Sequence, residues 1–236
     1  MTRATASPLL TTRYGIAAPA PGNALVARSL ALYGEWAERE TDLLSGLVTD
    51  GHHVVEIGGD HGAHTLWLAR AVGDSGAVHA FEPSRLGFQQ LCANVALNQL
   101  PNVHAHQAWA GRAKHGIEAD GAPVRCLAID DLALPALHLL KVNLANALVD
   151  ALVSASQVIK THAPLVYARL SGPTEAESEV AALKALDYRV WSHAPMLYNA
   201  DNHAGAARNI FPGIVASNVI AASAASGVEF EGLVEV

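Results

Sequence analysis

Residues 54–62 read VVEIGGDHG, and this short stretch indicates the fold more clearly than any other part of the chain. Its first four residues form a β-branched, mostly apolar run, which is typical of a strand buried in a parallel sheet. A glycine-rich turn follows at once, and residues 64–72 then show a helical pattern that Gly73 ends. A strand, a tight turn and a helix in this order predict the first unit of an open α/β sheet.

The same alternation continues along the chain. Further strands are expected at residues 77–81, 103–108, 137–144, 165–170, 188–192 and 213–220. Helices are expected at residues 24–47, 84–98, 148–160 and 175–186, with a hairpin-like excursion over residues 112–129. Strands that alternate with helices form right-handed βαβ units, so these patterns predict an α/β fold with a seven-stranded, mostly parallel sheet and helices on both faces. The last two strands lack an intervening helix, which favours an antiparallel end.

Composition limits both the organisation and the partners. Residues 1–22 are rich in Thr, Ala, Pro and Gly and are expected to form an irregular arm, while residues 23–236 are expected to form a single domain. The chain has 236 residues, a net charge of -7 and no run of basic residues, which argues against nucleic acid as a partner. Two cysteines, no signal peptide and no apolar stretch long enough for a membrane span favour a cytoplasmic protein that binds a small molecule.

The glycine turn has a spacing that bears on its ligand. The pattern from Glu56 to Gly62 is E-x-G-x-x-x-G, whereas a dinucleotide fingerprint is G-x-G-x-x-G. Asp60 lies inside the turn, and an acid there suits a cationic ligand without phosphates, such as S-adenosylmethionine. Glu82 ends the second strand, 20 residues after Gly62, at the offset where an acid meets ribose hydroxyls. The alternative to ligand binding is that the glycines only form the turn between strand and helix, and that Glu82 is a solvated cap.

Several further motifs are similar to those of a known family. They are YGEW at residues 33–36, VVEIGGDHGAHTL at 54–66, AFEP at 80–83, NVALN at 94–98, IDDL at 129–132, LLKV at 139–142, and the stretch from Asp201 to Phe211. Together they resemble the FkbM family of methyltransferases over nearly the whole chain. The resemblance implies a class I, Rossmann-like methyltransferase fold and S-adenosylmethionine as cofactor. It also implies O-methylation of a hydroxyl or carboxyl on a small natural-product or sugar-like acceptor.

The resemblance also implies a set of cofactor-binding residues. Glu56, Gly58, Asp60 and Gly62 would line the methionine part of the cofactor, Glu82 would bind the ribose, and Gln107 with Ala108 would border the adenine. The complete set of candidates is Glu56, Gly58, Gly59, Asp60, Gly62, Thr65, Glu82, Pro83, Gln107 and Ala108.

The chain departs from the family where the acceptor is expected. The family's fourth strand ends Lys-Ile-Asp-Val-Glu-Gly-Met-Glu, and residues 141–148 here read KVNLANAL, so Asn143, Ala145 and Leu148 replace three acids. Arg169 stands where the family has a glutamate at the end of the fifth strand. Acceptors bind at the carboxyl ends of such strands. Losing these acids removes candidate bases and hydrogen bonds to substrate while leaving cofactor binding nearly intact.

The remaining candidates are weaker. His61, Lys141 and Asn143 are the catalytic candidates, with a solvated loop histidine and a strand-end lysine as the plain alternatives. Tyr33, Glu35, His193 and Asn202 are the substrate-side candidates, although an aromatic anchor in the core would give the same helical spacing at Tyr33. No metal is expected, because the 12 histidines lack a zinc-site framework.

Three functions follow from these patterns. The primary prediction is an S-adenosylmethionine-dependent O-methyltransferase. The alternative is a catalytically degenerate relative that binds the cofactor and has a regulatory or assembly role. A nicotinamide oxidoreductase is a third option, which the glycine spacing disfavours. The sequence leaves the oligomeric state open, with a homodimer among the options.

Overall fold

The strand predicted from the VVEI run lies in the middle of the sheet. β3 (His53–Ile57) pairs in parallel with β10 (Leu139–Val142) on one edge and with β4 (Ala77–Phe81) on the other. The side chains of Val54, Val55 and Ile57 are buried. A strand with neighbours on both edges and packing on both faces requires this apolar run. The computed structural model describes residues 9–19, 24–112 and 116–236.

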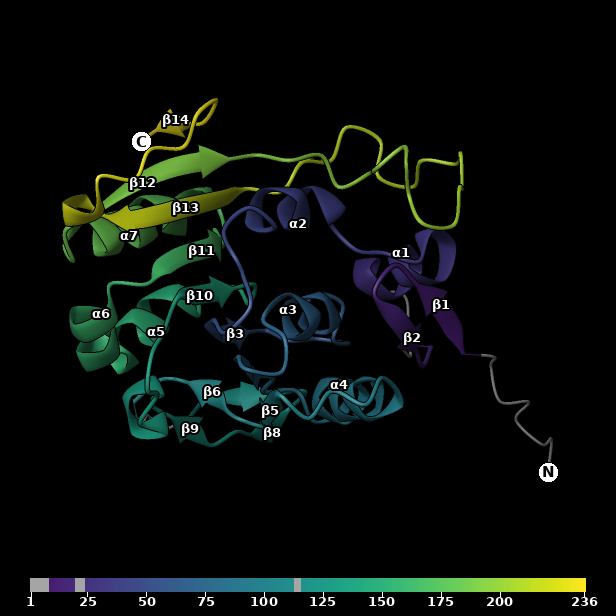
Figure 1. Ribbon diagram of the computed structural model, residues 1–236, viewed down its shortest axis with the longest axis horizontal. Helices are drawn as coiled ribbons and strands as arrows, with labels where there is room; N and C mark the ends of the chain where they lie inside the picture. The colour runs from purple at the N-terminus through teal and green to yellow at the C-terminus, as the bar shows by residue number, and fades with distance from the viewer. Residues whose placement is uncertain (1–8, 20–23, 113–115) are drawn as a thin grey trace.

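The central sheet has eight strands in the order β14-β12-β13-β11-β10-β3-β4-β5 (Figure 1). The other strands are β5 (Val103–His106), β11 (Leu165–Arg169), β12 (Tyr188–His193), β13 (Asn218–Ser223) and β14 (Val234–Glu235). β3, β4, β5, β10 and β11 are parallel, and β13 is antiparallel to both β11 and β12. The mostly parallel sheet with an antiparallel end is therefore confirmed. The predicted count of seven omitted β14, which has only two residues and no strong pattern.

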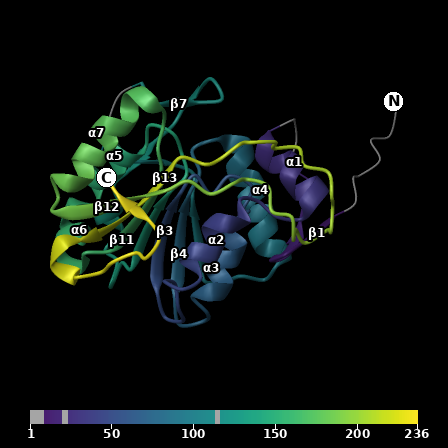
Figure 2. The ribbon, with the colours of Figure 1, turned by 90° about the horizontal axis from the view of Figure 1, so that it is seen from above.

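Helices cover both faces of the sheet. They are α1 (Leu25–Tyr33), α2 (Glu38–Leu44), α3 (Thr65–Ala71), α4 (Arg85–Leu97), α5 (Leu148–Ser154), α6 (Ser156–His162) and α7 (Pro173–Lys184). Seen from above, α5, α6 and α7 lie on one side of the sheet, and α2, α3 and α4 lie on the other (Figure 2). A buried apolar cluster fills each interface, with Val55 and Val142 on the first side and Val54 and Leu68 on the second. This is the doubly wound arrangement that the alternating pattern predicts.

Two expected helices are each divided in two. Residues 24–47 form α1 and α2 because Gly34 ends α1 in the left-handed conformation, with φ of 68°, and Ala37 also has positive φ. Residues 148–160 form α5 and α6, separated at Ala155, whose φ and ψ are not helical. α5 and α6 pack into one apolar cluster, whereas Tyr33 of α1 and Leu44 of α2 pack into different ones, yet the apolar spacing of the sequence continues across both breaks. Periodicity alone therefore could not locate them.

The last long strand lies later in the chain than expected. The prediction placed it at residues 213–220, whereas β13 begins at Asn218 and ends at Ser223. Arg169, the last residue of β11, pairs with Asn218, so the sheet ends at that level. Residues 214–217 lie beyond the end of β11 and line a cavity instead.

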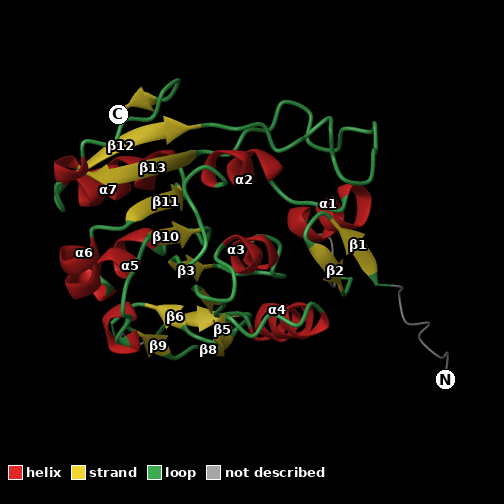
Figure 3. Cartoon of the chain, viewed as in Figure 1, coloured by secondary structure: helices red, strands yellow, loops and turns green. Residues whose placement is uncertain are grey.

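Short paired segments complete the fold (Figure 3). In the expected irregular arm, β1 (Leu10–Thr12) and β2 (Gly15–Ala17) form an antiparallel hairpin that packs against α4, while residues 1–8 and 20–22 lie outside the described part. The expected excursion contains an antiparallel hairpin, β7 (Glu118–Ala119) with β8 (Ala122–Pro123). β6 (Trp109–Ala110) pairs in parallel with β9 (Cys126–Leu127). Two 3-10 turns span Ile129–Leu132 and Ala224–Ser226.

Candidate functional site

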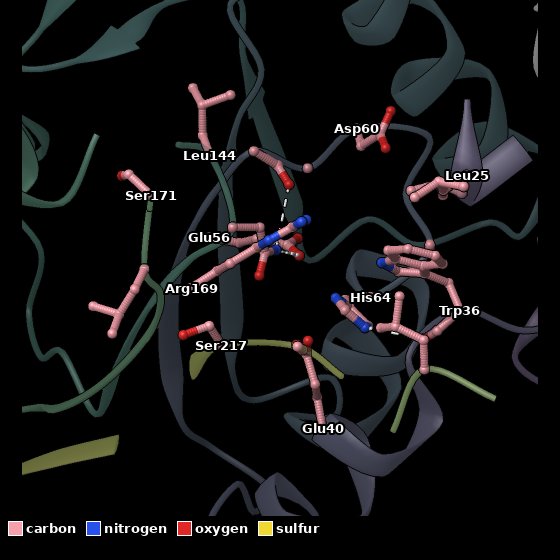
Figure 4. A pocket seen from close by; sticks show the side chains of 18 of the residues that line it. Leu25, Trp36, Glu40, Glu56, Asp60, His64, Leu144, Arg169, Ser171 and Ser217 are labelled. Atoms are coloured by element: carbon pink, nitrogen blue, oxygen red, sulfur yellow. Dashed lines mark hydrogen bonds between the residues drawn. The ribbon is translucent and has the colours of Figure 1, made fainter. Parts of the chain in front are cut away.

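A cavity of about 430 Å³ opens at the carboxyl ends of β3, β10 and β11 (Figure 4). This is the edge of an open α/β sheet at which ligands bind. Its lining comes from seven parts of the chain: residues 25–40, the end of β3 with the turn after it, Glu82, the end of β10, the end of β11, Leu197, and residues 214–217. The cavity therefore joins the glycine turn to segments that are far away in sequence.

The glycine turn takes a shape that L side chains disfavour. Gly58 has φ of 81°, Gly62 has φ of 79°, and Asp60 between them is also left-handed. A Cβ on Gly58 would lie 3.0 Å from the backbone nitrogen of Leu144, so β10 closes against the turn. Gly58, Gly59 and Asp60 line the cavity, whereas Gly62 faces α4.

Glu82 also lines the cavity, from the end of β4. One carboxylate oxygen accepts the backbone N–H of Asp60 at 2.8 Å, and the other accepts that of Ser84 at 2.9 Å. The residue is 6% exposed, and this burial raises the pKa of Glu82 to about 7. The turn and the acid are thus joined by the hydrogen bond from the Asp60 N–H to Glu82. Pro83, which follows, is buried and does not line the cavity.

Glu56 and Asn143 form the floor between the two sides of the cavity. Glu56 accepts the Thr65 hydroxyl at 2.5 Å on Oε2 and the Asn143 amide at 3.3 Å on Oε1. Asn143 also donates to the carbonyl of Gly58 at 3.3 Å. Burial is the main reason that the pKa of Glu56 is raised. Thr65 thus orients Glu56 from behind and does not face the cavity itself.

Lys141 lies beneath this floor and is 0% exposed. Its Nζ donates to Glu40 Oε2 and to His64 Nδ1, both at 3.2 Å, and also contacts Asn143 Oδ1. Burial alone would raise the pKa of Glu40, but Lys141 and His64 outweigh it and lower that pKa. Lys141 was expected to be a catalytic candidate, yet it does not reach the cavity, and its position makes it the counter-ion of a buried carboxylate.

His64 is held in one neutral form. Because an ammonium can only donate, His64 Nδ1 accepts from Lys141, and Nε2 at 3.2 Å from the carbonyl of Trp36 carries the proton. Burial and the nearby Lys141 charge lower the pKa of His64 to about 3. Both ring nitrogens are thus engaged, although His64 lines the cavity.

Three of the sequence candidates lie away from this cavity. His61 is buried on the other side of the turn, where its Nε2 lies 3.1 Å from Asp60 Oδ1 and its neighbours include Thr12 and Leu30. Asp60 has positive φ, and the turn there places His61 among residues of β1 and α1 and not in the cavity. Gln107 lines a separate hollow beside Arg125, and Ala108 is buried in the core.

The four substrate-side candidates are also structural. Tyr33 bonds the backbone of Arg208 and Ile210, and Glu35 accepts from Arg13, Asn199 and the backbone of His203. Asn202 bonds only nearby backbone at Asn199 and Ala206, and His193 bonds the hydroxyl of Tyr167 at 2.8 Å. Tyr33 and Glu35 thus hold the segment after β12 against the end of α1, whereas Asn202 bonds within that segment and His193 bonds β11. Of the YGEW run, Trp36 is the residue that lines the cavity.

Most cavity residues outside the turn were missed. They are Leu25, Val26, Glu40, His64, Leu144, Leu170, Ser171, Gly172, Leu197 and residues 214–217. Arg169 was noted only as a departure from the family. Apart from the helical apolar pattern at Leu25, these positions have no local signal, because only the sheet order brings them to one edge. No group of three metal-ligating side chains occurs within the described ranges. No helix in those ranges is both long and apolar enough to cross a bilayer.

The sheet order, the glycine turn and the acid at the end of β4 define a class I, Rossmann-like methyltransferase fold. Precorrin-6y C5,15-methyltransferase from Geobacter metallireducens has a TM-score of 0.58 and 14% identity, and the match covers 79% of this chain and 89% of that one. Methyltransferase FkbM from Methylobacillus flagellatus has a TM-score of 0.54 and 17% identity, covering 73% of this chain and 44% of that one.

A methyltransferase from Streptococcus mutans, solved in complex with SAH, has a TM-score of 0.51 and 13% identity, and the match covers 78% of this chain and 96% of that one. Comparisons with family models and with curated sequences gave no match. At these identities the likeness establishes the fold alone. The roles of individual residues therefore depend on the geometry of this chain.

Proposed function

We propose that this chain binds S-adenosylmethionine in the cavity and transfers its methyl group to an oxygen of a small-molecule acceptor, as the FkbM-type methyltransferases do. The observation that carries the proposal is the set of three carboxylates, Glu56, Asp60 and Glu82, at the glycine-turn side of the cavity. Their chemistry suits a ligand that carries a ribose diol, an amino group and a sulfonium charge, and no phosphate.

Each carboxylate has a distinct part in this proposal. Both oxygens of Glu82 accept one backbone N–H each, and a carboxylate oxygen has a second lone pair that can accept a ribose hydroxyl. Glu56, held by Thr65 and Asn143, presents a fixed negative charge at the floor. Asp60 is partly exposed, on the same side of the cavity as Leu25 (Figure 4), and its carboxylate would bind the amino group of the cofactor.

When bound, S-adenosylmethionine supplies a methyl group on a sulfonium sulfur, whose displacement mainly requires correct orientation of the acceptor. Asn143 and Leu144 at the end of β10 face the middle of the cavity and would border that centre. The cavity volume of about 430 Å³ is within the usual range for small-ligand sites. The net charge of -7 further favours a small acceptor over nucleic acid.

Calorimetric titration with S-adenosylhomocysteine, S-adenosylmethionine and NAD tests the cofactor. We expect binding of the two adenosyl ligands and none of NAD, with about 2.7 kcal/mol of added stability at ~100 times the dissociation constant. Glu82→Gln should weaken binding at least about tenfold, since it removes a charge-assisted acceptor. Glu177→Gln, on the exposed side of α7, is the matched control. Absence of binding at millimolar S-adenosylhomocysteine would contradict the proposal.

A second candidate is a cofactor-binding relative without turnover. It is favoured by Asn143, which stands at an acid position of the resembling family and has its amide committed to Glu56 and Gly58. If it is correct, Asn143→Asp with Ala145→Glu should create methyl transfer from labelled cofactor to small hydroxyl or carboxyl acceptors. Efficient transfer by the unmodified protein would eliminate this candidate.

A further inference from the structure

The cavity has two sides that the sheet order separates. Glu82 follows β4 and the glycine turn follows β3, whereas Arg169 ends β11, two strands from β3 on the other side of β10. Adjacent strands are about 4.8 Å apart, so Arg169 is on the order of 14 Å along the sheet from the end of β4. If the cofactor occupies the β3–β4 side, as proposed above, Arg169 belongs to the acceptor side.

Arg169 is a cation on that side, and it has no partner among the residues that the structure describes. It is exposed, lines the cavity, and forms no hydrogen bond or ion pair with any residue of the described ranges. Ser217 lies on the neighbouring segment, where its carbonyl accepts from Leu170, and its hydroxyl likewise has no partner among the residues described. A guanidinium at the end of β11 and a hydroxyl on the neighbouring segment present donors that match a carboxylate. Figure 4 shows both side chains on the β11 side of the site.

The carboxylates near Arg169 are already compensated. Glu40 is paired with Lys141 at 3.2 Å and accepts from Asn218 at 3.0 Å. Glu56 accepts from Thr65 and Asn143 and forms no ion pair with Arg169. The charge of Arg169 is therefore available to a ligand.

The nitrogen-bearing side chains around the centre of the cavity are not free to act as a general base, and the Glu56 carboxylate at its floor already accepts from Thr65 and Asn143. His64 has both ring nitrogens engaged, and the Nζ of Lys141 is committed to Glu40, His64 and Asn143. Asn143 is an amide and cannot accept a proton from substrate. A hydroxyl acceptor requires a base, whereas a carboxylic acid is already ionised at neutral pH.

Apolar side chains also line the cavity, and Trp36 and Leu25 lie across it from Arg169 (Figure 4). Trp36 and Leu197 line the cavity from one side, and Leu25, Ile214 and Val215 surround its mouth with large side chains that are at least 41% exposed. Exposed apolar side chains around an opening mark a surface that a ligand covers. The acceptor therefore has an apolar body as well as an anionic group.

We propose that the methyl acceptor is a carboxylic acid with an apolar body, and that Arg169 and Ser217 bind its carboxylate; this rests on the proposed function. A lone pair of one carboxylate oxygen forms a bond to the methyl carbon while the carbon–sulfur bond breaks and its electron pair stays on sulfur. The products are a methyl ester and neutral S-adenosylhomocysteine, and no proton is transferred. A carboxylate has about four lone-pair sites, so Arg169 and Ser217 can hold it while one remains for attack.

The test compares acids with neutral analogues of the same shape. Octanoate and 4-phenylbutyrate are offered with labelled S-adenosylmethionine, beside 1-octanol and octanamide. We expect methyl ester from the acids and no transfer to the neutral analogues. Arg169→Gln should raise KM for the acid about 10- to 100-fold, as expected for loss of a charge-assisted hydrogen bond, and Arg169→Lys should restore part of it. Lys160→Gln, an exposed charge loss on α6, is the control.

The outcomes separate this inference from the proposed function. S-adenosylhomocysteine should bind Arg169→Gln as tightly as the parent, because Arg169 is on the acceptor side; loss of that binding would overturn the assignment. Transfer to octanol and not to octanoate would also overturn it while supporting the methyltransferase. If neither octanol nor octanoate is methylated, octanoate is titrated into the complex of the protein with S-adenosylhomocysteine. Absence of binding at millimolar octanoate then rejects the inference. Failure of S-adenosylhomocysteine itself to bind would instead reject the proposed function.

Discussion

Replacement of Lys141 by methionine tests whether this residue is structural rather than catalytic. Lys141→Met keeps a long apolar stem in a site that is 0% exposed, and it removes the only cation within hydrogen-bonding distance of Glu40 among the described residues. Glu40 would keep the Asn218 amide as its donor, while His64 Nδ1 and Asn143 Oδ1 would lose theirs. One buried charge and two buried acceptors would thus be left without their partner.

The expected cost is large because an uncompensated buried charge dominates it. Removing one partner of a buried ion pair destabilises a protein by about 3–5 kcal/mol. For a chain of this size each kcal/mol lowers Tm by about 2–4 °C, so Tm should fall by about 6–20 °C. Lys141 lowers the pKa of Glu40, so the ion pair adds stability above the unfolded pKa of 4.5 and loses it as pH falls. The difference between parent and variant should therefore shrink toward pH 4.

Urea unfolding followed by circular dichroism measures this cost. Lys160→Met serves as the control, because Lys160 is exposed on α6 and should change stability by less than about 0.5 kcal/mol. The double variant Lys141→Met/Glu40→Gln removes the stranded charge and should recover part of the loss. A single variant within about 1 kcal/mol of the parent at pH 7 would refute the assignment of Lys141 as a structural counter-ion.

Three other predictions concern the turn, the acid and the histidines. Burial raises the pKa of Glu82 to about 7. If the ionised form of Glu82 binds the ribose, affinity for S-adenosylhomocysteine should rise from pH 6 to pH 8, and protons should be released on binding. Binding that does not depend on pH would contradict this role. Gly58→Ala should lower the free energy of unfolding by about 1–3 kcal/mol more than Gly205→Ala. Both glycines have positive φ, but only at Gly58 would a Cβ contact backbone, that of Leu144. Equal unfolding midpoints for the two variants would contradict this. Burial among other histidines lowers the pKa of His79 to about 4. The folded state therefore binds fewer protons than the unfolded state, and stability should fall as pH drops from 6.5 to about 4. If urea unfolding shows the same fall for His79→Gln, His79 is not the cause of the pH dependence.

The amino-acid sequence alone predicted the fold class and the glycine-turn side of the cavity. The signals are local: the VVEI run, the glycines at 58 and 59, and Asp60 lie in one segment, and Glu82 ends the next strand. A βα turn and the neighbouring parallel strand have nearly the same relation in every such sheet, so short-range pattern is sufficient to bring them together.

The other side of the site was decided by tertiary structure. Arg169 and Ser217 meet because β13 returns antiparallel beside β11, and nothing within either segment encodes that pairing. The burial of Lys141 beneath Asn143, and the turning of His61 away from the cavity, also depend on packing between distant elements. Side-chain type states what a residue can do, but whether it faces a ligand or a buried partner depends on which chain segment covers it. In this chain His61 and Lys141 are buried away from the cavity, whereas Arg169 lies in it.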